Sequence, residues 1–384
     1  MDFYSTYANL TDEQNLIMRS TRDWVNQVIR PDINKYFQEG VVHPEAFMGL
    51  AEIGAFGLII PEKYGGCGMD FVSFGLMMQE LERCDSSIRV VSSIQTSLVM
   101  YAIHEFGSEA QKEYYLPRLA SGELMGAFGL TEPDFGSNPS GMICRFDVSN
   151  EHILLQGSKM WIGNSENADL SIVWAKNSEN EVCGIIIEKG KVSNFTSNTF
   201  QDKWSFRSSK TGELIFNESK VPIQNLLPNT KGIQSAYKCL NIGRFAVAWG
   251  SLGIAMECFD TALKYSQERL QFGKPIGSKQ LIQKKLASMA TEITKAQLLC
   301  MQLARLMDQG ESHYAQVSMA KRNNVKMAQA VAMESRQILG GMGISTEYPI
   351  MRHMINLETL ITYQGTNEIH ELIIGRELTG FDAF

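Results

Sequence analysis

A single block of short β-rich runs, set between two long regions with helical periodicity, most strongly constrains the fold of this chain. Between residues 126 and 232 the runs HILLQGSKMWI, LSIVWAK, CGIIIEK and GELIFNESKVPI are separated by Asn, Ser, Gly and Lys, as in strands joined by turns. Beyond residue 233, only Pro275 and Pro349 interrupt the helical pattern. We therefore expect an α+β fold with an N-terminal α-helical domain (1–125), a central β domain that is a barrel or a sandwich (126–232), and a C-terminal helical bundle (233–384).

The helical regions contain their own start and stop signals. Thr11 and Gln14 form a capping-box pattern, and apolar residues then recur at helical spacing until Pro31. The three long stretches that follow residue 233 each end in glycine, which favours a helix stop. Frequent methionine and alanine in these stretches suit a tightly packed bundle.

Composition and charge argue against several classes of function. The net charge is −7 and the basic residues do not bunch, so no nucleic-acid partner is expected. No uninterrupted apolar run reaches the roughly 18 residues of a membrane span. Because the N-terminus lacks the pattern of a signal peptide, we expect a cytoplasmic protein. The seven cysteines are scattered and the six histidines form no HxxxH pattern, which indicates free thiols and no metal site. No GxGxxG follows an early strand, so a Rossmann cofactor site is not indicated either.

Six motifs, in order along nearly the whole chain, resemble the acyl-CoA dehydrogenase family and most closely its glutaryl-CoA dehydrogenase branch. They are PEKYGG (61–66), GAFGLTEPDFGSNPSGM (126–142), KMWIGNS (159–165), RLQFGKPI (269–276), LGGMGIS (339–345) and TYQGTNEIH (362–370). The resemblance implies an N-terminal helical domain, a central β domain and a C-terminal four-helix bundle. It also implies non-covalently bound FAD, and a homotetramer in which a neighbouring subunit completes the FAD site. Members of the family remove the α-proton of an acyl thioester and transfer its β-hydrogen to the flavin as hydride.

The resemblance also implies a set of FAD-binding residues. Those expected around the flavin ring are Phe128, Leu130, Thr131, Trp161, Ile162 and Gly163, with Thr131 beside flavin N5 and Trp161 covering one face. Those expected to reach the FAD of a partner subunit are Arg269, Gln271, Phe272, Gln337, Gly340 and Gly341, and Thr366 and Asn367 secure FAD after the catalytic loop. Two structural alternatives stay open. Trp161 could be a core residue of the β domain, and the Arg269 and glycine motifs could be ordinary helix ends.

For the substrate, the resemblance implies a thioester pocket with Arg244 at its catalytic end and Ser137 on the pantetheine side. In glutaryl-CoA dehydrogenases the equivalents of Glu82, Arg89, Ser93 and Tyr363 surround the distal carboxylate. An arginine inside the apolar segment SSIRVVSSI needs a partner, because an unpaired buried charge is costly. The partner is either a carboxylated ligand, which we favour since the guanidinium fork matches a carboxylate, or an internal acid such as Glu82 or Asp85.

The base of the reaction is missing from its expected place. The family's catalytic glutamate corresponds to Gln364, and a neutral carboxamide does not remove a carbon-bound proton. Some relatives place the base immediately before the equivalent of Arg244, but that residue is Gly243 here. Gln364, Arg244 and Tyr363 therefore mark the catalytic end of the pocket, while the chemistry of dehydrogenation is in doubt.

Several interpretations of the missing base remain. The chain is either a dehydrogenase in which Glu was replaced by Gln to trap a substrate, or a naturally divergent flavoprotein. We favour divergence, because Gly163 replaces a usual threonine and Asn138 a usual aspartate. Divergent chemistry includes flavin oxygenase or oxidase activity, for which Gly163 could open space for oxygen at the flavin, and action on a β-keto or glutaconyl-like thioester with an acidic α-proton. A non-catalytic FAD or thioester-binding protein is a third class. The thioester carrier is CoA or an acyl carrier protein, and the electron acceptor is an electron-transfer flavoprotein or oxygen.

Overall fold

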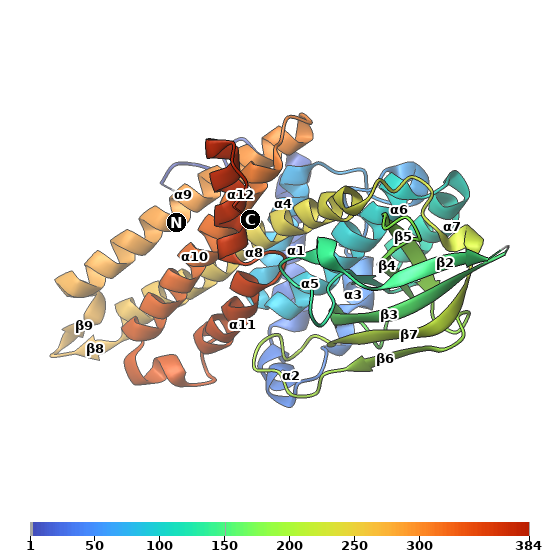
Figure 1. The fold of residues 1–384 in the computed structure, drawn as a ribbon. Helices are drawn as coiled ribbons and strands as arrows, with labels where there is room; N and C mark the ends of the chain where they lie inside the picture. The colour runs from blue at the N-terminus through green and yellow to red at the C-terminus, as the bar shows by residue number, and fades with distance from the viewer. Residues whose placement is uncertain (1–2, 150, 384) are drawn as a thin grey trace.

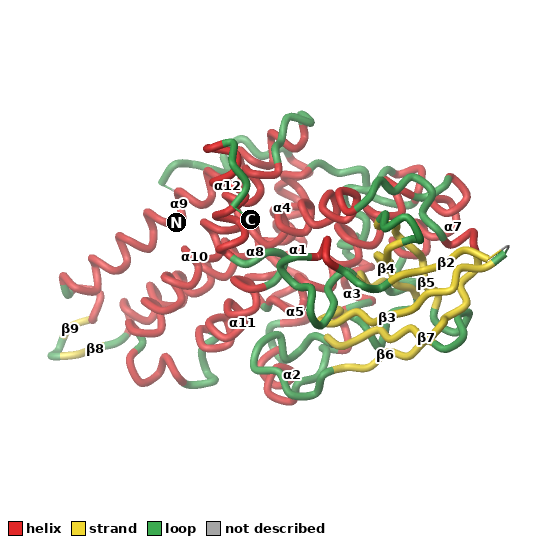
Figure 2. Tube along the Cα trace, viewed as in Figure 1, coloured by secondary structure: helices red, strands yellow, loops and turns green. Residues whose placement is uncertain are grey.

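The computed structural model describes residues 3–149 and 151–383 of the chain. A curled β-sheet lies at one end of the molecule, and long helices extend from it toward the other end (Figure 1). Figure 2 shows the same division, with most strands grouped on one side and a short hairpin at the opposite end. The expected α+β class, with helices before and after a central sheet, is confirmed.

The N-terminal region is helical, as predicted. Thr11 begins its first helix with the expected capping box, in which its hydroxyl and the Gln14 side chain each bind the other residue's backbone N–H. A π-helical segment, Ile94–Met100, connects two of the helices without a break in the helical path, from Ser86 to Phe106. The helices are α1 (Asp12–Trp24), α2 (Ile33–Glu39), α3 (Met48–Glu52), α4 (Phe71–Cys84), α5 (Ser86–Ser93), α6 (Tyr101–Phe106) and α7 (Glu109–Ala120).

The central region is a seven-stranded mixed sheet with β5 also paired to β4. Its strands are β1 (Gly126–Gly129), β2 (Arg145–Ser149), β3 (His152–Gly163), β4 (Leu170–Lys176), β5 (Val182–Glu188), β6 (Phe195–Thr199) and β7 (Thr211–Pro222). The path is β1-β4-β2-β3-β7-β6, and β1 runs parallel to β4. Leu170, Ile172 and Trp174 of β4 pack on the helices, while Val173 and Ala175 join a second core inside the curled sheet. Both faces of β4 are therefore buried, as alternation of side chains requires.

The C-terminal region is a helical bundle around α8. Its elements are α8 (Ile233–Glu268), the hairpin β8 (Leu270–Gln271) and β9 (Lys274–Pro275), α9 (Gln280–Asp308), α10 (Tyr314–Ile338), α11 (Ile350–Thr362) and α12 (Asn367–Thr379). Helix α12 returns to the middle of the molecule, beside α10 (Figure 1). The tight turn between α11 and α12 contains Gln364, and this return brings it to the centre of the fold.

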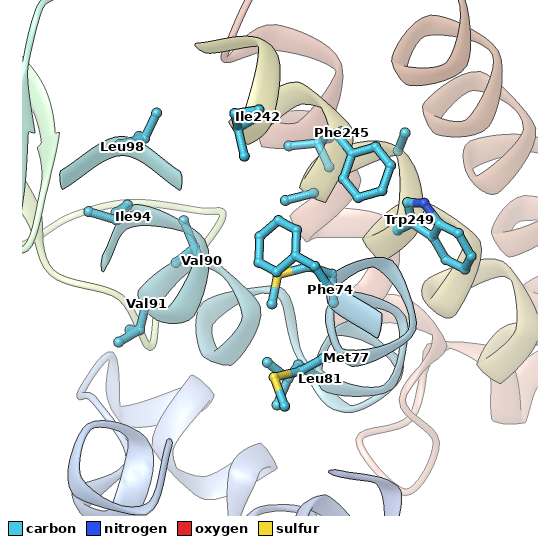
Figure 3. Close-up of a cluster of buried hydrophobic side chains, with 14 of the residues drawn as sticks. Phe74, Met77, Leu81, Val90, Val91, Ile94, Leu98, Ile242, Phe245 and Trp249 are labelled. Atoms are coloured by element: carbon cyan, nitrogen blue, oxygen red, sulfur yellow. The ribbon is translucent and has the colours of Figure 1, made fainter. Parts of the chain in front are cut away.

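Helix α8 links the bundle to the N-terminal helices through an aromatic core. Phe74 of α4 stacks on Phe245 of α8 with ring centroids 6.1 Å apart, and Trp249 lies one turn further along (Figure 3). By length and composition α8 alone, among the helices described, could cross a membrane. However, 83% of its apolar window is buried inside the protein, which is typical of a core helix. Its hydrophobicity therefore reflects its central position.

Candidate active site

A cavity of about 1170 Å³ lies where the sheet meets α5, α8 and the turn between α11 and α12. This volume exceeds that of a common small-ligand pocket, about 300–1,000 Å³, and suits two ligands or one long one. Many residues singled out from the sequence line it together: Phe128, Leu130, Thr131, Ser137, Trp161, Ile162, Gly163, Arg244, Tyr363, Gln364 and Thr366. Four segments of the chain thus build a single site.

Trp161 forms part of the cavity wall and is not a core residue. It is 58% exposed and has a positive φ of 61°, next to a register shift in the pairing of β3 with β7. A non-glycine residue in this conformation is uncommon and is found preferentially at functional sites. Its indole makes an edge contact with Phe200 at 5.0 Å. The alternative that Trp161 is buried in the β domain is therefore wrong.

A buried ion pair supports the segment that follows β1. The Lys159 ammonium lies 2.8 Å from Glu132 and also donates to the Leu130 carbonyl at 3.1 Å. Glu132 in turn accepts from the backbone N–H groups of Ile143 and Cys144. The hydroxyl of Thr131 makes no hydrogen bond with any described residue, which leaves it available to a ligand in the cavity. Leu130 and Thr131 are thus held rigidly while their cavity side stays open.

The glycine at position 163 does not create free space. A Cβ atom built on Gly163 would lie 2.4 Å from Cδ1 of Ile94, which is far inside van der Waals contact. Ile94 belongs to the π-helical segment and lines the same cavity. In this structure the terminal Cδ1 of Ile94 fills the volume that a side chain at position 163 would occupy, and the expectation that Gly163 opens room for oxygen stays a prediction.

Gln364 lies on a strained turn whose backbone carbonyls accept hydrogen bonds from two cationic side chains. Its φ is 53° and that of Gly365 is 90°. The Arg244 Nε donates to the Gln364 carbonyl at 3.0 Å, and the Lys321 ammonium donates to the Gly365 carbonyl at 2.7 Å. Thr366 then caps α12 through its hydroxyl. The side-chain Oε1 of Gln364 is buried without a hydrogen-bond partner among the described residues, which is unusual unless a ligand supplies one.

The two positions that could provide a base meet in space. A Cβ atom built on Gly243 would lie 2.5 Å from Oε1 and 2.7 Å from Nε2 of Gln364. The carboxamide of Gln364 therefore occupies the volume beside Gly243, because its atoms are the nearest ones that such a Cβ would meet. No Asp or Glu side chain lines this end of the cavity among the described residues; Glu358 and Asp382, which do line the cavity, are not on the turn or on α8.

At the other side of Tyr363 lies a fully buried arginine cluster. The Arg89 guanidinium makes two bonds with Glu82, Nε to Oε2 at 2.7 Å and Nη2 to Oε1 at 2.9 Å. It also donates to Ser93 Oγ at 3.1 Å and to the Tyr363 hydroxyl at 2.6 Å. Arg89 therefore has the internal partner Glu82. Asp85 is not that partner, because it pairs with Arg352 at 2.6 Å.

Three family models, described as the N-terminal, middle and C-terminal domains of acyl-CoA dehydrogenase, match residues 11–123, 127–219 and 230–379. The chain belongs to the acyl-CoA dehydrogenase family. A glutaryl-CoA dehydrogenase of Desulfococcus multivorans is 35% identical over 99% of this chain and 98% of its own length. A glutaryl-CoA dehydrogenase structure from Mycobacterium smegmatis has a TM-score of 0.95 and 43% identity, covering 98% of this chain and 97% of that one. Another from the same organism, in complex with FADH2, has a TM-score of 0.97 and 39% identity, covering 99% and 98%. The predicted family and fold are confirmed.

One group of predicted residues in this acyl-CoA dehydrogenase homologue lies away from the cavity. Arg269, Gln271 and Phe272 belong to the β8–β9 hairpin, at the far end of the bundle from the sheet (Figure 1). Gln337, Gly340 and Gly341 lie at the end of α10, and Phe272 is 94% exposed. Asn367 is buried beside the Gln364 turn, with its side-chain oxygen unpaired among the described residues. One chain therefore brings together the residues predicted for the flavin ring and the thioester but leaves the hairpin group apart.

The family resemblance missed several residues of the site. Lys203, Phe206 and Ser209 come from the loop before β7, while Tyr237 and Lys238 come from α8, and all line the cavity. These residues belong to none of the sequence motifs that carry the resemblance. Lys321 and His370, both fully buried under the Gln364 turn, were also missed. Lys321 lies among the buried positions of α10, and this placement could have indicated a functional role, because lysine is rarely fully buried without a partner.

Gly250 of α8 is required by the arginine cluster. A Cβ atom built there would lie 1.6 Å from Oε2 of Glu82 and 3.2 Å from Nε of Arg89. We expect Gly250→Ala to lower the unfolding temperature, because overpacking of this kind costs about 1–3 kcal/mol. Gly375→Ala in α12 is the matched control. A Cβ atom built there has no other atom within 4 Å, so the substitution should raise the unfolding temperature slightly. Equal thermal shifts in the two variants would contradict the requirement.

Proposed function

We propose that this protein is an FAD-dependent oxidoreductase that acts on an acyl thioester, is similar to glutaryl-CoA dehydrogenase, and takes a short carboxylated acyl group. The single observation that carries the proposal is the arginine cluster at the Tyr363 side of the cavity. Arginine has five N–H donors, and four are used in its bonds to Glu82, Ser93 and Tyr363. One N–H donor of Arg89 is left unused by these bonds, and Tyr363, which accepts from Arg89, connects the cluster to the cavity that it lines.

Tyr363 provides the second donor to such a carboxylate. Its oxygen accepts from Arg89, so its own O–H remains free to donate toward the cavity that it lines. Burial raises the pKa of Tyr363 to about 12, so the hydroxyl stays protonated at neutral pH. Glu82 neutralises the charge of Arg89, so the pair would bind a carboxylate through directed hydrogen bonds and not through a net charge. This arrangement fits a distal carboxylate at a fixed distance from the thioester.

The residues fit FAD as the cofactor. The open hydroxyl of Thr131, the rigid Leu130 segment and the exposed indole of Trp161 form the kind of wall that a flat ring requires. FAD, when bound, supplies the acceptor for the two electrons of substrate oxidation. The exposed hairpin residues Arg269, Gln271 and Phe272, with Gln337, Gly340 and Gly341, are proposed to bind the FAD of a neighbouring subunit in a homotetramer.

The roles of this chain's residues at the thioester follow from their hydrogen bonds. Arg244 and Lys321 fix the turn, and Gln364 presents a neutral amide to the α-carbon side of the pocket. Dehydrogenation of an ordinary saturated thioester is therefore expected to be slow. Where dehydrogenation does occur, an electron-transfer flavoprotein is the proposed acceptor. No observation favours an oxygen site, since Ile94 fills the space at Gly163.

A comparison of glutaryl-CoA with butyryl-CoA tests this function. The purified protein should be yellow, and glutaryl-CoA should bind at least about tenfold more tightly than butyryl-CoA, because a good charge-assisted contact is worth about 1.5–3 kcal/mol. Anaerobic titration followed by flavin absorbance and by calorimetry measures both binding and reduction. A colourless protein, or equal affinity for the two thioesters, would argue against the proposal.

A further inference from the structure

A fully buried lysine of α10 contacts the backbone of the turn between α11 and α12. The Lys321 ammonium donates to the Gly365 carbonyl at 2.7 Å. Helix α12 lies beside α10, so the turn that begins α12 is brought against this lysine (Figure 1). The described lining of the cavity includes Gln364, Gly365 and Thr366 but not Lys321. Any effect of Lys321 on a ligand in the cavity therefore acts through the turn.

Lys321 differs from Lys159, which is equally buried, in having no acidic partner. The Lys159 ammonium lies 2.8 Å from the Glu132 carboxylate. Among the described residues, Lys321 forms no ion pair, and its hydrogen-bond acceptor is the Gly365 carbonyl. A buried cation without a counterion is costly to the folded state. The fold alone therefore does not account for a charged group at this position.

The turn has a backbone conformation that needs support from its surroundings. The φ angle is 53° at Gln364 and 90° at Gly365. A non-glycine residue is disfavoured in this left-handed region and stays there only where neighbouring structure fixes it. Arg244 of α8 binds one carbonyl of the turn, and Lys321 binds the next. Because a peptide unit is planar, each fixed carbonyl also fixes the N–H group of the following residue, as far as Thr366.

Lys321 is the cation of this turn that changes its charge near neutral pH. Burial, and then the neighbouring Arg244 of α8, lower the pKa of Lys321 to about 7, and the exposed Glu368 of α12 opposes this shift. Burial lowers the pKa of Arg244 to about 10 and that of His370 of α12 to about 2, so both keep their charge state at neutral pH. Among the described residues, α9 and α11, which also pack on α10, place no titratable group that acts on Lys321. The ammonium is thus present below about pH 7 and is lost as pH rises through this value.

We propose that Lys321 is a positioning residue of the candidate active site, and that its hydrogen bond to the Gly365 carbonyl holds residues 364–366 in the conformation that binds an acyl thioester. The inference rests on the proposed function in so far as the ligand is an acyl thioester in this cavity. A neutral amine at the same place holds the carbonyl less strongly, because a charge-assisted hydrogen bond is roughly twice as strong as a neutral one. Loss of the charge therefore loosens the turn and lowers the affinity for the ligand.

Hydrogen exchange of the turn, measured by mass spectrometry on the ligand-free holoenzyme, tests this hold directly. The informative peptide covers residues 363–370, in which the N–H groups of Ile369 and His370 donate to Thr366. Its protection, relative to the intrinsic exchange rate at each pH, should fall at least about fivefold between pH 6 and pH 8.5. In Lys321→Met the protection should be low at both pH values. The unfolding temperature of this variant should change little, because the charge that it removes was itself costly.

Binding of butyryl-CoA, followed by calorimetry and by flavin absorbance, tests the consequence for the ligand. At pH 6, Lys321→Met should bind it at least about fivefold more weakly than the wild type, and this difference should disappear by pH 8.5. Lys321→Arg keeps its charge at both pH values and should restore the affinity at each. Lys326→Met, the same change at an exposed position of α10, is the matched control and should behave as the wild type. Comparison of the variants at each pH cancels the titration of the phosphates of the thioester.

A wild-type protection of residues 363–370 that does not depend on pH would overturn the proposal, and this measurement decides even where Lys321→Met does not fold. Equal affinities of the wild type and Lys321→Met for butyryl-CoA at pH 6 would also overturn it, because Lys321 would then serve the fold alone. Butyryl-CoA has no distal carboxylate, so the Arg89 cluster does not enter the comparison. Absence of butyryl-CoA binding in every variant would count against the proposed function instead, and the exchange profile would then decide whether Lys321 positions the turn.

Discussion

Replacing Gln364 by Glu is expected to raise the rate of flavin reduction by a saturated acyl thioester by about 10²–10⁴-fold, the usual contribution of a well-placed general base. The new carboxylate would occupy the volume of the present carboxamide, beside Gly243. Arg244 and Lys321 already bind the backbone at positions 364 and 365. Their charges should hold the pKa of the new carboxyl down, so it is ionised and able to accept the α-proton at neutral pH.

Stopped-flow reduction of the flavin under anaerobic conditions measures this effect with glutaryl-CoA and butyryl-CoA. A second route to the same chemistry is the double variant Gly243→Glu with Gln364→Gly, because the Cβ direction at 243 leads directly to the present amide. Gln27→Glu is the control for an added charge. Wild-type protein that already reduces its flavin as fast as Gln364→Glu would show that the base lies elsewhere.

The motifs of the sequence were sufficient for the family, and most residues that they predict around the flavin ring line one cavity. Segments such as KMWIGNS and TYQGTNEIH have strong local patterns, and Trp161 and Gln364 indeed lie in the same cavity. The packing around Gly163 could not be predicted from the sequence. It depends on Ile94, which is distant in sequence and fills the volume beside the glycine. A glycine in a motif shows that a side chain is absent, but the sequence does not show which neighbouring residue fills the space.

The buried charges were the other part that the sequence left open. The apolar setting of Arg89 indicated that it needs a partner, yet Glu82 and Asp85 were equally available along the chain. Only the packing of α4, α5 and α11 assigns Glu82 to Arg89 and Asp85 to Arg352. Lys321 and His370 received no role from the sequence, since their importance comes from the return of α12 across α10.

Replacing Arg89 by Met is expected to abolish the preference for a distal carboxylate. Loss of a charge-assisted partner costs a bound carboxylate about 2–5 kcal/mol, so glutaryl-CoA should bind about 30-fold more weakly or worse. Butyryl-CoA lacks the carboxylate and should bind within a few-fold of its original affinity. Calorimetry with both thioesters measures the discrimination directly.

The same variant should destabilise the protein, because it leaves Glu82 buried and unpaired at an expected cost of about 3–5 kcal/mol. The double variant Glu82→Gln with Arg89→Met removes both charges, so most of the thermal stability should return while the glutaryl-CoA preference does not. This cycle separates the two roles of the cluster. Recovery of the preference together with the stability would assign the ion pair to the fold alone, whereas recovery of stability alone places the distal carboxylate at Arg89 and Tyr363.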